Sequence, residues 1–440
     1  MRQFLPVGEY RWLPKDEIES INWTEQKPEQ DYGYIVECTL RYPDELHDSH
    51  ESFPLAPERI DLDYEMLSPY SQECLKKYKP QAYKNHKTTK LGATFGKRVD
   101  YVCHYRNLAL YLQQGMILEK VSRVIKFRQK PFLREYVDVM TERRKQAISI
   151  FEKNFFKLLI NSVFGKFIEN LRTQTNCVFV NKASRLARCL RNPAFDRWRI
   201  IGENLVVFYN KKKIVKMNKP YVIGFSVLDI SKCHMFDLHY NHIKVAAPNA
   251  SVCLTDTDSL LLYLPDMSKR TLLEKCKNIF DFSNYPKTHD LYDATRKMIP
   301  GYLKDENGGR QLIEVIGMKA KVYAFRTKCG GVGKKCKGVP KRIVKRDFDL
   351  STYLDCLRQA SIVRASSTRL QAKNFQMSLV ASRKIGLTAL DDKKYIWPCG
   401  IHTTSFYSKI VREGTTTCPK CHCTVEMMKN SVFQKDDDDE

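Results

Sequence analysis

Asp256-Thr257-Asp258-Ser259 lies between two apolar runs, Val252-Cys253-Leu254 and Leu260-Leu261-Leu262. Two apolar runs joined by a short polar segment predict a β-hairpin, and we expect this hairpin to be buried. Because side chains two positions apart on a strand share a face, both carboxylates are expected to meet one divalent ion with a preference for oxygen ligands. The alternative is an acidic turn whose Asp side chains bond the nearby backbone.

The chain is strongly basic, since 74 Lys and Arg outnumber 50 Asp and Glu among 440 residues and give a formal charge of +24. Such an excess indicates a polyanionic partner, with nucleic acid as the first candidate. Membrane-surface binding is the competing explanation, but the basic residues are spread through core-forming segments and do not gather on one amphipathic helix. A generally basic, soluble surface without such a partner is the other alternative. A hydrophobic content of 43% predicts a large core and excludes a disordered chain.

The cellular location is judged from the chain start and the cysteines. Residues 1–6 lack the apolar stretch of a signal peptide, so an intracellular protein with its 15 cysteines reduced is expected. No segment approaches the roughly 18 consecutive apolar residues of a membrane span, and we expect no membrane association.

Hydrophobic periodicity predicts an α+β fold. Apolar residues recur three and four positions apart over residues 131–172, which predicts helix. Residues 1–90 are expected to form strands and loops, and residues 173–219 an inserted β-rich or irregular segment. Further on, we expect a strand over 221–228, a helix over about 229–245, the acidic hairpin, and a strand pair over 312–325.

Two charged segments stand out near the C-terminus. Residues 334–346 hold seven basic residues among thirteen and no acid, which suits a phosphate-tracking linker or a nuclear-import signal, with a solvated basic loop as the alternative. The nuclear-import interpretation predicts a nuclear location. Residues 436–440 are all acidic and are expected to be disordered.

One stripe of the predicted helix carries Lys153, Lys157, Asn161 and Phe164, spaced by four, four and three. Lysines one turn apart suit a triphosphate, although a solvated charged face explains them equally well. The opposite side of this helix is expected to be buried, and it carries Phe151, Phe155, Leu158 and Leu159.

The polar motifs resemble those of a known family. Lys157-Leu-Leu-Ile-Asn161-Ser162-Val-Phe164-Gly165-Lys166, followed by Thr255-Asp256-Thr257-Asp258-Ser259, resembles motifs B and C of family B DNA polymerases. Lys321-Val322-Tyr323 resembles the K-x-Y motif of the protein-primed branch. Further stretches resemble polymerases of Polinton/Maverick-type elements: Gly33-Tyr34-Ile35, Phe151-Glu152-Lys153, Gly224-Phe225-Ser226 and Gly301-Tyr302-Leu303.

The resemblance implies a right-hand fold with palm, fingers and thumb. It implies a DNA-directed DNA polymerase that transfers dNMP to a primer 3′-hydroxyl by a two-metal mechanism, in the replication of a virus-like or transposable element. Its cofactors are two Mg²⁺ ions, or Mn²⁺ in their place. Its implied partners are primer–template DNA, dNTP and a terminal priming protein, and a monomer is expected.

The resemblance also implies roles for single residues. Asp258 is the main metal ligand, and Asp256 lies beside it. For the upstream cation that grips the β- and γ-phosphates with Lys157, Arg143 and Arg144 are close alternatives to Lys145. The implied groups are the catalytic metal ligands Asp256 and Asp258, the nucleotide-binding residues Lys145, Lys157, Asn161 and Phe164, and the primer-binding residues Lys321 and Tyr323.

The implied domains follow the motifs along the chain. A partial palm with the first protein-primed-type insertion covers 1–125, fingers helices 126–172, the second insertion 173–219, the palm with motif C and K-x-Y 220–330, and a thumb-like region with the acidic tail 331–440. The cationic row of the fingers is expected to face the acidic hairpin across one nucleotide.

The chain departs from the family pattern in two ways. Phe164 replaces the usual Tyr of motif B, which keeps the ring and loses a hydroxyl. Motif A, an Asp followed by a Leu-Tyr pair, is not visible, and residues 1–8 resemble the stretch that follows it. We therefore expect a polymerase truncated before or at motif A, without the exonuclease domain and part of the palm. The alternative is a catalytically inactive nucleic-acid-binding remnant of this fold.

One group of residues lies outside the family pattern. Cys399-x-x-His402 and Cys418-x-x-Cys421 have the pair spacing of a tetrahedral zinc site, with His422 and Cys423 as substitutes. Free reduced thiols are the alternative, because a cysteine-rich chain produces such pairs by accident. A zinc-dependent structural or adaptor protein is a third hypothesis, which depends on these pairs alone.

Overall fold

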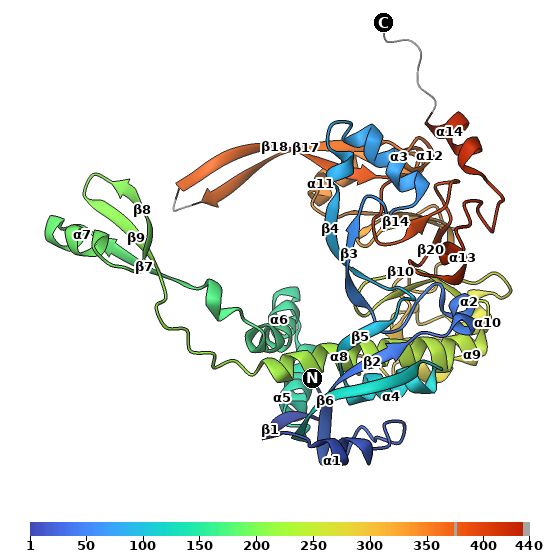
Figure 1. The fold of residues 1–440 in the computed structure, drawn as a ribbon, viewed down its shortest axis with the longest axis horizontal. Helices are drawn as coiled ribbons and strands as arrows, with labels where there is room; N and C mark the ends of the chain where they lie inside the picture. The colour runs from blue at the N-terminus through green and yellow to red at the C-terminus, as the bar shows by residue number, and fades with distance from the viewer. Residues whose placement is uncertain (374–375, 434–440) are drawn as a thin grey trace, which may run out of the picture. The chain divides into compact units, whose positions relative to one another are not determined.

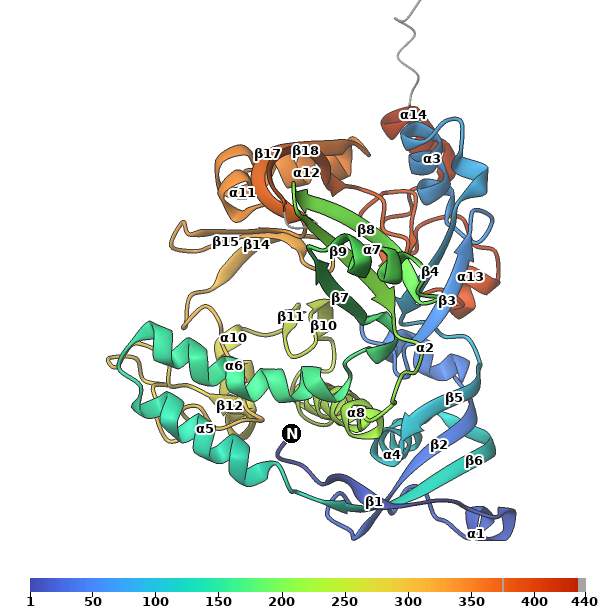
Figure 2. The same ribbon diagram turned by 90° about the vertical axis from the view of Figure 1, so that its left-hand side faces the viewer.

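The computed structural model describes residues 1–373 and 376–433, and the chain forms two compact units (Figures 1 and 2). The first unit comprises Met1–Leu5, Pro131–Val227 and Ser366–Ser382, and the second comprises Pro6–Lys130, Leu228–Ala365 and Arg383–Glu440. The acidic residues 436–440, for which the sequence predicts disorder, lie outside the described residues.

The second unit begins with a four-stranded sheet of order β1-β6-β2-β5. Val36, Cys38 and Leu40 alternate along the central strand β2 and are fully buried, because alternate residues of a strand share one face. Helix α4 packs against β2 and β5 and contributes Leu108 and Tyr111 to the same core. The bounds are β1 Leu5–Trp12, β2 Tyr32–Arg41, β5 Arg98–His104, β6 Ile117–Lys130 and α4 Tyr105–Gln113.

A second group of elements in the N-terminal region consists of an antiparallel hairpin and helix α3. The helix begins after Ser68, whose side chain accepts a hydrogen bond from the Ser71 amide, and Pro69 occupies its first turn. Residues 1–90 were expected to form strands and loops, but they also contain helices that this expectation did not include. The bounds are β3 Glu58–Asp63, β4 Lys87–Gly92, α3 Pro69–Tyr78, α1 Lys15–Glu19 and α2 His47–His50.

Helix α8 runs without interruption over Tyr221–Asp237, so the predicted strand over 221–228 is wrong. That stretch is apolar without a period of two, and such a run does not distinguish a strand from a buried helix. The predicted helix over about 229–245 is confirmed as the second half of α8, a π-helical turn at Leu238–Ile243 and α9 at Lys244–Ala246.

The acidic segment joins two short antiparallel strands, β10 and β11, so the predicted hairpin is confirmed. The inner side of this hairpin packs on a core that includes Leu272, Ile279 and Phe282. The bounds are β10 Ser251–Thr255, β11 Leu260–Tyr263, α10 Lys269–Lys275, β12 Phe280–Asp281 and β13 Leu303–Lys304.

A three-stranded sheet of order β14-β15-β16 follows, and it confirms the strand pair predicted over 312–325. The basic segment 334–346 is neither a linker nor a loop, because it contains the end of β16 and most of α11, with Cys336, Ile343 and Val344 buried. The bounds are β14 Leu312–Lys319, β15 Val322–Thr327, β16 Val332–Cys336, α11 Lys341–Asp347, α12 Leu350–Arg358, β17 Ile362–Lys373 and β18 Gln376–Thr388.

The C-terminal segment returns to the N-terminal part of the second unit, where α14 lies beside α3 (Figure 1). Tyr70 and Cys74 of α3 share a small core with Ile396 and Met428. The bounds are β19 Tyr395–Ile396, β20 Thr403–Thr404, α13 Lys409–Arg412 and α14 Val425–Val432.

The first unit contains the helix pair α5 and α6, which lie side by side (Figure 2), and a sheet of order β7-β9-β8. A capping box starts α6, because Ser149 and Glu152 bond each other's backbone amides. The bounds are α5 Arg134–Gln146, α6 Ile150–Phe167, β7 Thr175–Val180, α7 Ala183–Leu190, β8 Phe195–Gly202 and β9 Leu205–Lys211.

The helices predicted over 131–172 are confirmed, but the expected burial of the apolar side of α6 is wrong. Phe151 is 77% exposed, Leu158 63% and Phe155 46%. The neighbouring helix α5 is mostly polar and buries only Val137, so it offers this apolar side little apolar surface to pack against. Among the described residues, no helix is both long enough and apolar enough to cross a membrane.

Candidate functional site

The two carboxylates occupy the turn between β10 and β11 and do not lie on the strands. The Asp256 amide donates to the Ser259 carbonyl at 3.2 Å, and the Asp258 amide donates to the Asp256 carbonyl at 2.7 Å. Thr257, between them, has a φ of 64°, and both Asp side chains are exposed. The expected burial and the argument from one strand face are therefore wrong: a turn leaves both carboxylates in water, where they need no partner to offset desolvation.

The β14–β15 hairpin lies against β10 and brings Lys321 to the acidic turn. Gly317 of β14 approaches Leu254 so closely that a Cβ added to the glycine would lie 3.3 Å from the leucine side chain. Lys321 occupies the hairpin turn with a φ of 64°, and its Nζ lies 3.3 Å from Asp256 Oδ1. Both side chains are about half exposed, so this ion pair adds little to stability and mainly records the proximity of the two turns.

Tyr323 follows Lys321 on β15 and is held by neighbouring side chains. Its ring stacks on that of Phe325, with centroids 6.3 Å apart. Lys335, directly opposite on β16, has its Nζ 5.4 Å from the Tyr323 ring centroid. A hydrogen bond with Tyr323 raises the pKa of Lys335. Lys335 is therefore a second cation beside Tyr323, in addition to Lys321.

Lys335 was not singled out from the sequence, where it was one of seven basic residues in segment 334–346. The signal that identifies it is the strand register, because Tyr323 pairs with Lys335 across β15 and β16. The register between two strands is set by the hairpin turn and by packing. It cannot be predicted from residue spacing alone.

The predicted nucleotide-binding residues lie in the first unit. Lys157 and Asn161 are exposed on α6 and Phe164 is half-buried, and the predicted helical row is confirmed by the bounds of α6. Lys145 lies in the last turn of α5, and its Nζ lies 3.4 Å from Glu142 Oε2. Arg143 is exposed, as Lys145 is, whereas the alternative Arg144 is half-buried. Because Asp258 belongs to the other unit, the expected meeting of these residues around one nucleotide stays a prediction.

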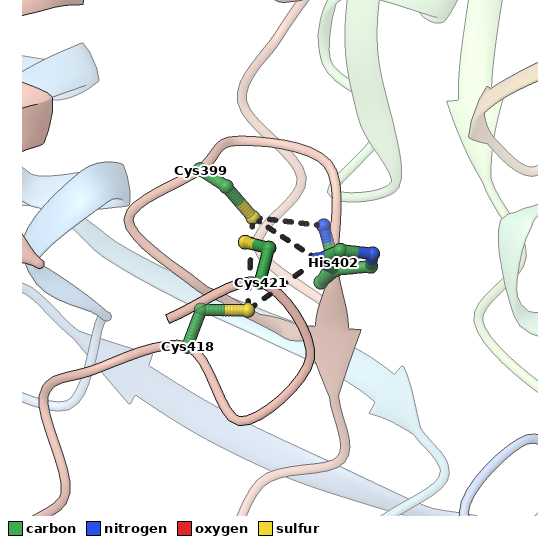
Figure 3. Close-up of side chains that lie close together, drawn as sticks. All are labelled: Cys399, His402, Cys418 and Cys421. Atoms are coloured by element: carbon green, nitrogen blue, oxygen red, sulfur yellow. Dashed lines mark hydrogen bonds between the residues drawn. The ribbon is translucent and has the colours of Figure 1, made fainter. Parts of the chain in front are cut away.

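The C-terminal Cys and His pairs come together in the second unit (Figure 3). One ligand atom from each of Cys399, His402, Cys418 and Cys421 lies within 4.8 Å of every other. Across residues 1–373 and 376–433 this is the single group of three or more His, Cys, Asp and Glu residues with metal-binding proximity. Within that range, Asp256 and Asp258 thus have no third acidic, Cys or His ligand beside them.

Comparison with known proteins identifies similarity at two levels. The sequence profile of the organellar and viral type B DNA polymerases matches residues 1–246, which include α6 and end before the Asp256 turn. No curated protein matches the chain.

Two solved structures share its fold. Phi29 DNA polymerase complexed with primer-template DNA, a post-translocation binary complex, matches with a TM-score of 0.50 and 14% identity over 87% of this chain and 55% of that chain. An orthorhombic crystal form of Phi29 DNA polymerase matches with a TM-score of 0.50 and 13% identity over 88% and 56%. The chain thus spans little more than half of that polymerase's length, and the predicted α+β, right-hand polymerase fold is confirmed.

Proposed function

Because the chain belongs to the type B DNA polymerases of organelles and viruses, we propose that it carries out DNA-directed transfer of dNMP to a primer 3′-hydroxyl. The observation that supports this most strongly is the ion pair between Lys321 of the β14–β15 hairpin and Asp256 of the acidic turn. This pair joins the motif proposed to bind metal to the motif proposed to bind the primer end.

Asp258 and Asp256 are the residues that would hold Mg²⁺. Two carboxylates suit this ion, because it commonly binds one or two carboxylates together with water and substrate phosphates. When bound, Mg²⁺ or Mn²⁺ supplies positive charge to the attacking and leaving oxygens. Their exposure in the turn leaves the two carboxylates accessible to an ion and to substrate.

The primer end is bound by Lys321 and Tyr323, with Lys335 as a further contact. Lys321 exchanges Asp256 for a primer phosphate, which is a stronger partner than a half-exposed carboxylate. Tyr323, fixed by Phe325 and Lys335, orients the terminal nucleotide without a change of conformation. Together, these contacts of Lys321 and Tyr323 with the primer end would keep the primer 3′-hydroxyl near Asp258.

The incoming dNTP is bound in this proposal by Lys145, Lys157, Asn161 and Phe164 of the first unit. The exposed Lys145 and Lys157 would offset the charge of the triphosphate. The Asn161 amide and the Phe164 ring would contact the base and sugar of the nucleotide. The K-x-Y motif supports the protein-primed branch, with a terminal priming protein as a partner. The Polinton/Maverick-like stretches support replication of a virus-like or transposable element, and the basic segment supports a nuclear location.

A second candidate function is nucleic-acid binding without catalysis. It is favoured by the observation that, within the described residues, no third His, Cys, Asp or Glu side chain joins Asp256 and Asp258 in a possible metal-binding group, whereas the family pattern calls for a further carboxylate from motif A. The basic surface would remain and the transfer would be lost.

Primer extension by the purified chain, with Mg²⁺, dNTPs and a labelled primer–template, separates the two candidates. We expect weak extension that disappears in Asp258→Ala and persists in the matched control Asp266→Ala, an exposed acid that bonds the Asn249 side chain. DNA binding should persist in both variants, because it depends on the basic surface.

Binding without any incorporation would support the second candidate and overturn the first. Robust extension by the unmodified chain, abolished by Asp258→Ala, would instead contradict the need for a further carboxylate. A chain that binds no DNA would contradict both candidates.

A further inference from the structure

We propose that Cys399, His402, Cys418 and Cys421 bind one structural zinc ion that fastens the C-terminal segment to the N-terminal part of the second unit. This site is independent of the proposed polymerase function. It uses none of the residues assigned to metal, nucleotide or primer.

Figure 3 shows the four side chains converging, and three of the distances between their ligand atoms match the edges of a tetrahedron around zinc. His402 Nδ1 lies 3.4 Å from the Sγ atoms of both Cys399 and Cys418, and these two Sγ atoms lie 3.9 Å apart. With Zn–S bonds of about 2.3 Å and a Zn–N bond of about 2.0–2.1 Å, a tetrahedron has sulfur–sulfur edges of about 3.8 Å and sulfur–nitrogen edges of about 3.6 Å. The three side chains therefore already have the spacing of a metal-bound state.

The first pair of ligands lies at the tip of the β19–β20 hairpin. The Trp397 amide donates to the His402 carbonyl at 2.9 Å, and the His402 amide donates to Cys399 Sγ at 3.4 Å. Gly400, with a φ of 71°, permits the sharp turn between the two ligands. Backbone amides that point at a thiolate stabilise its charge, as they do around bound metals.

The second pair lies in a separate turn. The Cys418 amide donates to the Cys423 carbonyl at 3.0 Å, and the His422 amide donates to the Cys418 carbonyl at 2.9 Å. His422 has a φ of 59°, so the chain reverses directly after Cys421. The spacing of the sequence also allowed Cys423 as a zinc ligand in place of Cys421. The Cys423 sulfur instead donates to the Thr424 carbonyl at 3.7 Å. The structure therefore selects Cys421 over Cys423.

Four protein ligands leave no open coordination position, which is typical of structural and not of catalytic zinc. The nearby contacts show what the ion would hold together. Thr404, two residues after the ligand His402, donates to Glu51 Oε1 at 2.6 Å, and Lys420 lies 3.8 Å from Glu51 Oε2. Both ligand turns therefore meet Glu51 of the N-terminal region, and one ion would fix the two turns against it.

The test is the metal content of the full chain purified under reducing conditions. We expect about one zinc per chain, and we expect chelation to lower the melting temperature, because a ligand that binds only the folded state stabilises it. Cobalt added to the chelated protein should give the visible spectrum of a tetrahedral thiolate site.

Variants locate the site. Cys421→Ser should weaken zinc binding by more than about a hundredfold, since changes outside the coordination sphere alone cost about 10–100-fold. Cys423→Ser, two residues away, is the matched control and should retain the metal. His402→Cys should also retain it, because four cysteines bind zinc in the same geometry.

Three results would overturn the proposal. The first is folded, reduced protein with less than about a tenth of a zinc per chain and no tetrahedral cobalt spectrum. The second is equal metal loss in Cys421→Ser and Cys423→Ser. The third is a Cys399–Cys418 disulfide in the freshly purified protein.

Discussion

Lys321 is the residue at which the acidic turn and the β14–β15 hairpin meet. Its ammonium pairs with Asp256 while its neighbour Tyr323 is fixed by Phe325 and Lys335. Because the Lys321–Asp256 pair is half exposed, its value for folding is small, and a phosphate can replace the carboxylate at little cost. The expected role of Lys321 is therefore in binding and not in stability.

Lys321→Ala should reduce binding of a primer–template end by roughly tenfold or more, because a hydrogen bond to a charged group contributes about 1.5–3 kcal/mol. The free energy of unfolding should change by about 1 kcal/mol at most. Lys321→Arg should keep most of the affinity, and Lys328→Ala, an exposed lysine directly after β15, is the control. Fluorescence anisotropy and urea unfolding measure the two effects. A large stability loss with unchanged DNA affinity would contradict this role.

Lys394 is a half-buried cation whose environment makes stability depend on pH. Its Nζ donates to Ser405 Oγ at 2.7 Å and to the Glu51 carbonyl at 3.3 Å. Burial lowers the pKa of Lys394 to about 8, against the opposing influence of Glu51 and Asp391. Because this folded-state pKa lies below the unfolded value of 10.5, the unfolded chain binds more protons between these pH values, and stability contributed by this group rises with pH across the window.

Lys394→Met should remove that contribution, so the variant should gain stability relative to wild type at pH 8 and the gain should shrink as the pH approaches 10.5. Urea unfolding at both pH values measures the difference, with Lys393→Met as the neighbouring control. A difference between variant and wild type that stays constant with pH would refute the assignment.

The β15–β16 pair shapes the surface beside the acidic turn. Gly333 lies under the Phe325 ring, and a Cβ added there would lie 2.1 Å from Phe325 Cζ. The glycine thus lets the Phe325 ring lie flat against Tyr323, with an interplanar angle of 22°.

Gly333→Ala should therefore destabilise the unit by about 1–3 kcal/mol through overpacking and should weaken primer binding by displacing Tyr323. Gly202→Ala is the matched strand control, because no atom lies within 4 Å of its added Cβ. Thermal unfolding and anisotropy of both variants are the measurements. Equal effects of the two substitutions would show that the close approach of Phe325 has no consequence.

Elements with a clear local signal were predictable, and those set by tertiary packing were not. The β10–β11 hairpin and the helical row from Lys157 to Phe164 follow from apolar spacing. The first half of α8 was predicted as strand, because its run of apolar residues has no period and only packing decides its conformation. The exposure of Asp256 and Asp258 follows from their place in a local turn, which the sequence allowed as an alternative to the strand arrangement. The pairing of Lys335 with Tyr323 depends on contacts between strands that a single sequence does not specify.

The net charge of +24 predicts how the affinity for DNA responds to salt. Each phosphate contact releases condensed counterions, so binding that uses about six contacts should weaken about a thousandfold between 50 and 200 mM salt. Titration of labelled DNA over this salt range measures the slope. Affinity that does not change with salt would contradict both the polymerase and the remnant proposals.

The sequence did not predict that the chain divides into these two units. The order of motifs assigned the residues proposed to bind the nucleotide and the turn proposed to bind metal to separate segments, and the structure assigns them to different units. The spacing within Cys399-x-x-His402 and Cys418-x-x-Cys421 predicted two possible pairs of zinc ligands, but it did not predict that the pairs meet. Their convergence required the fold to bring the β19–β20 hairpin and the Cys418 turn to the same residue, Glu51.

If the acidic turn and the β14–β15 hairpin hold the primer end, a photoreactive nucleotide at the primer 3′ terminus will react with these two segments. After irradiation of the bound primer–template, mass spectrometry of the digested protein maps the adducts, whether or not the chain is catalytically active. We predict adducts within 251–263 and 312–327. Bound DNA whose 3′ adducts lie entirely outside these two segments would contradict the claim.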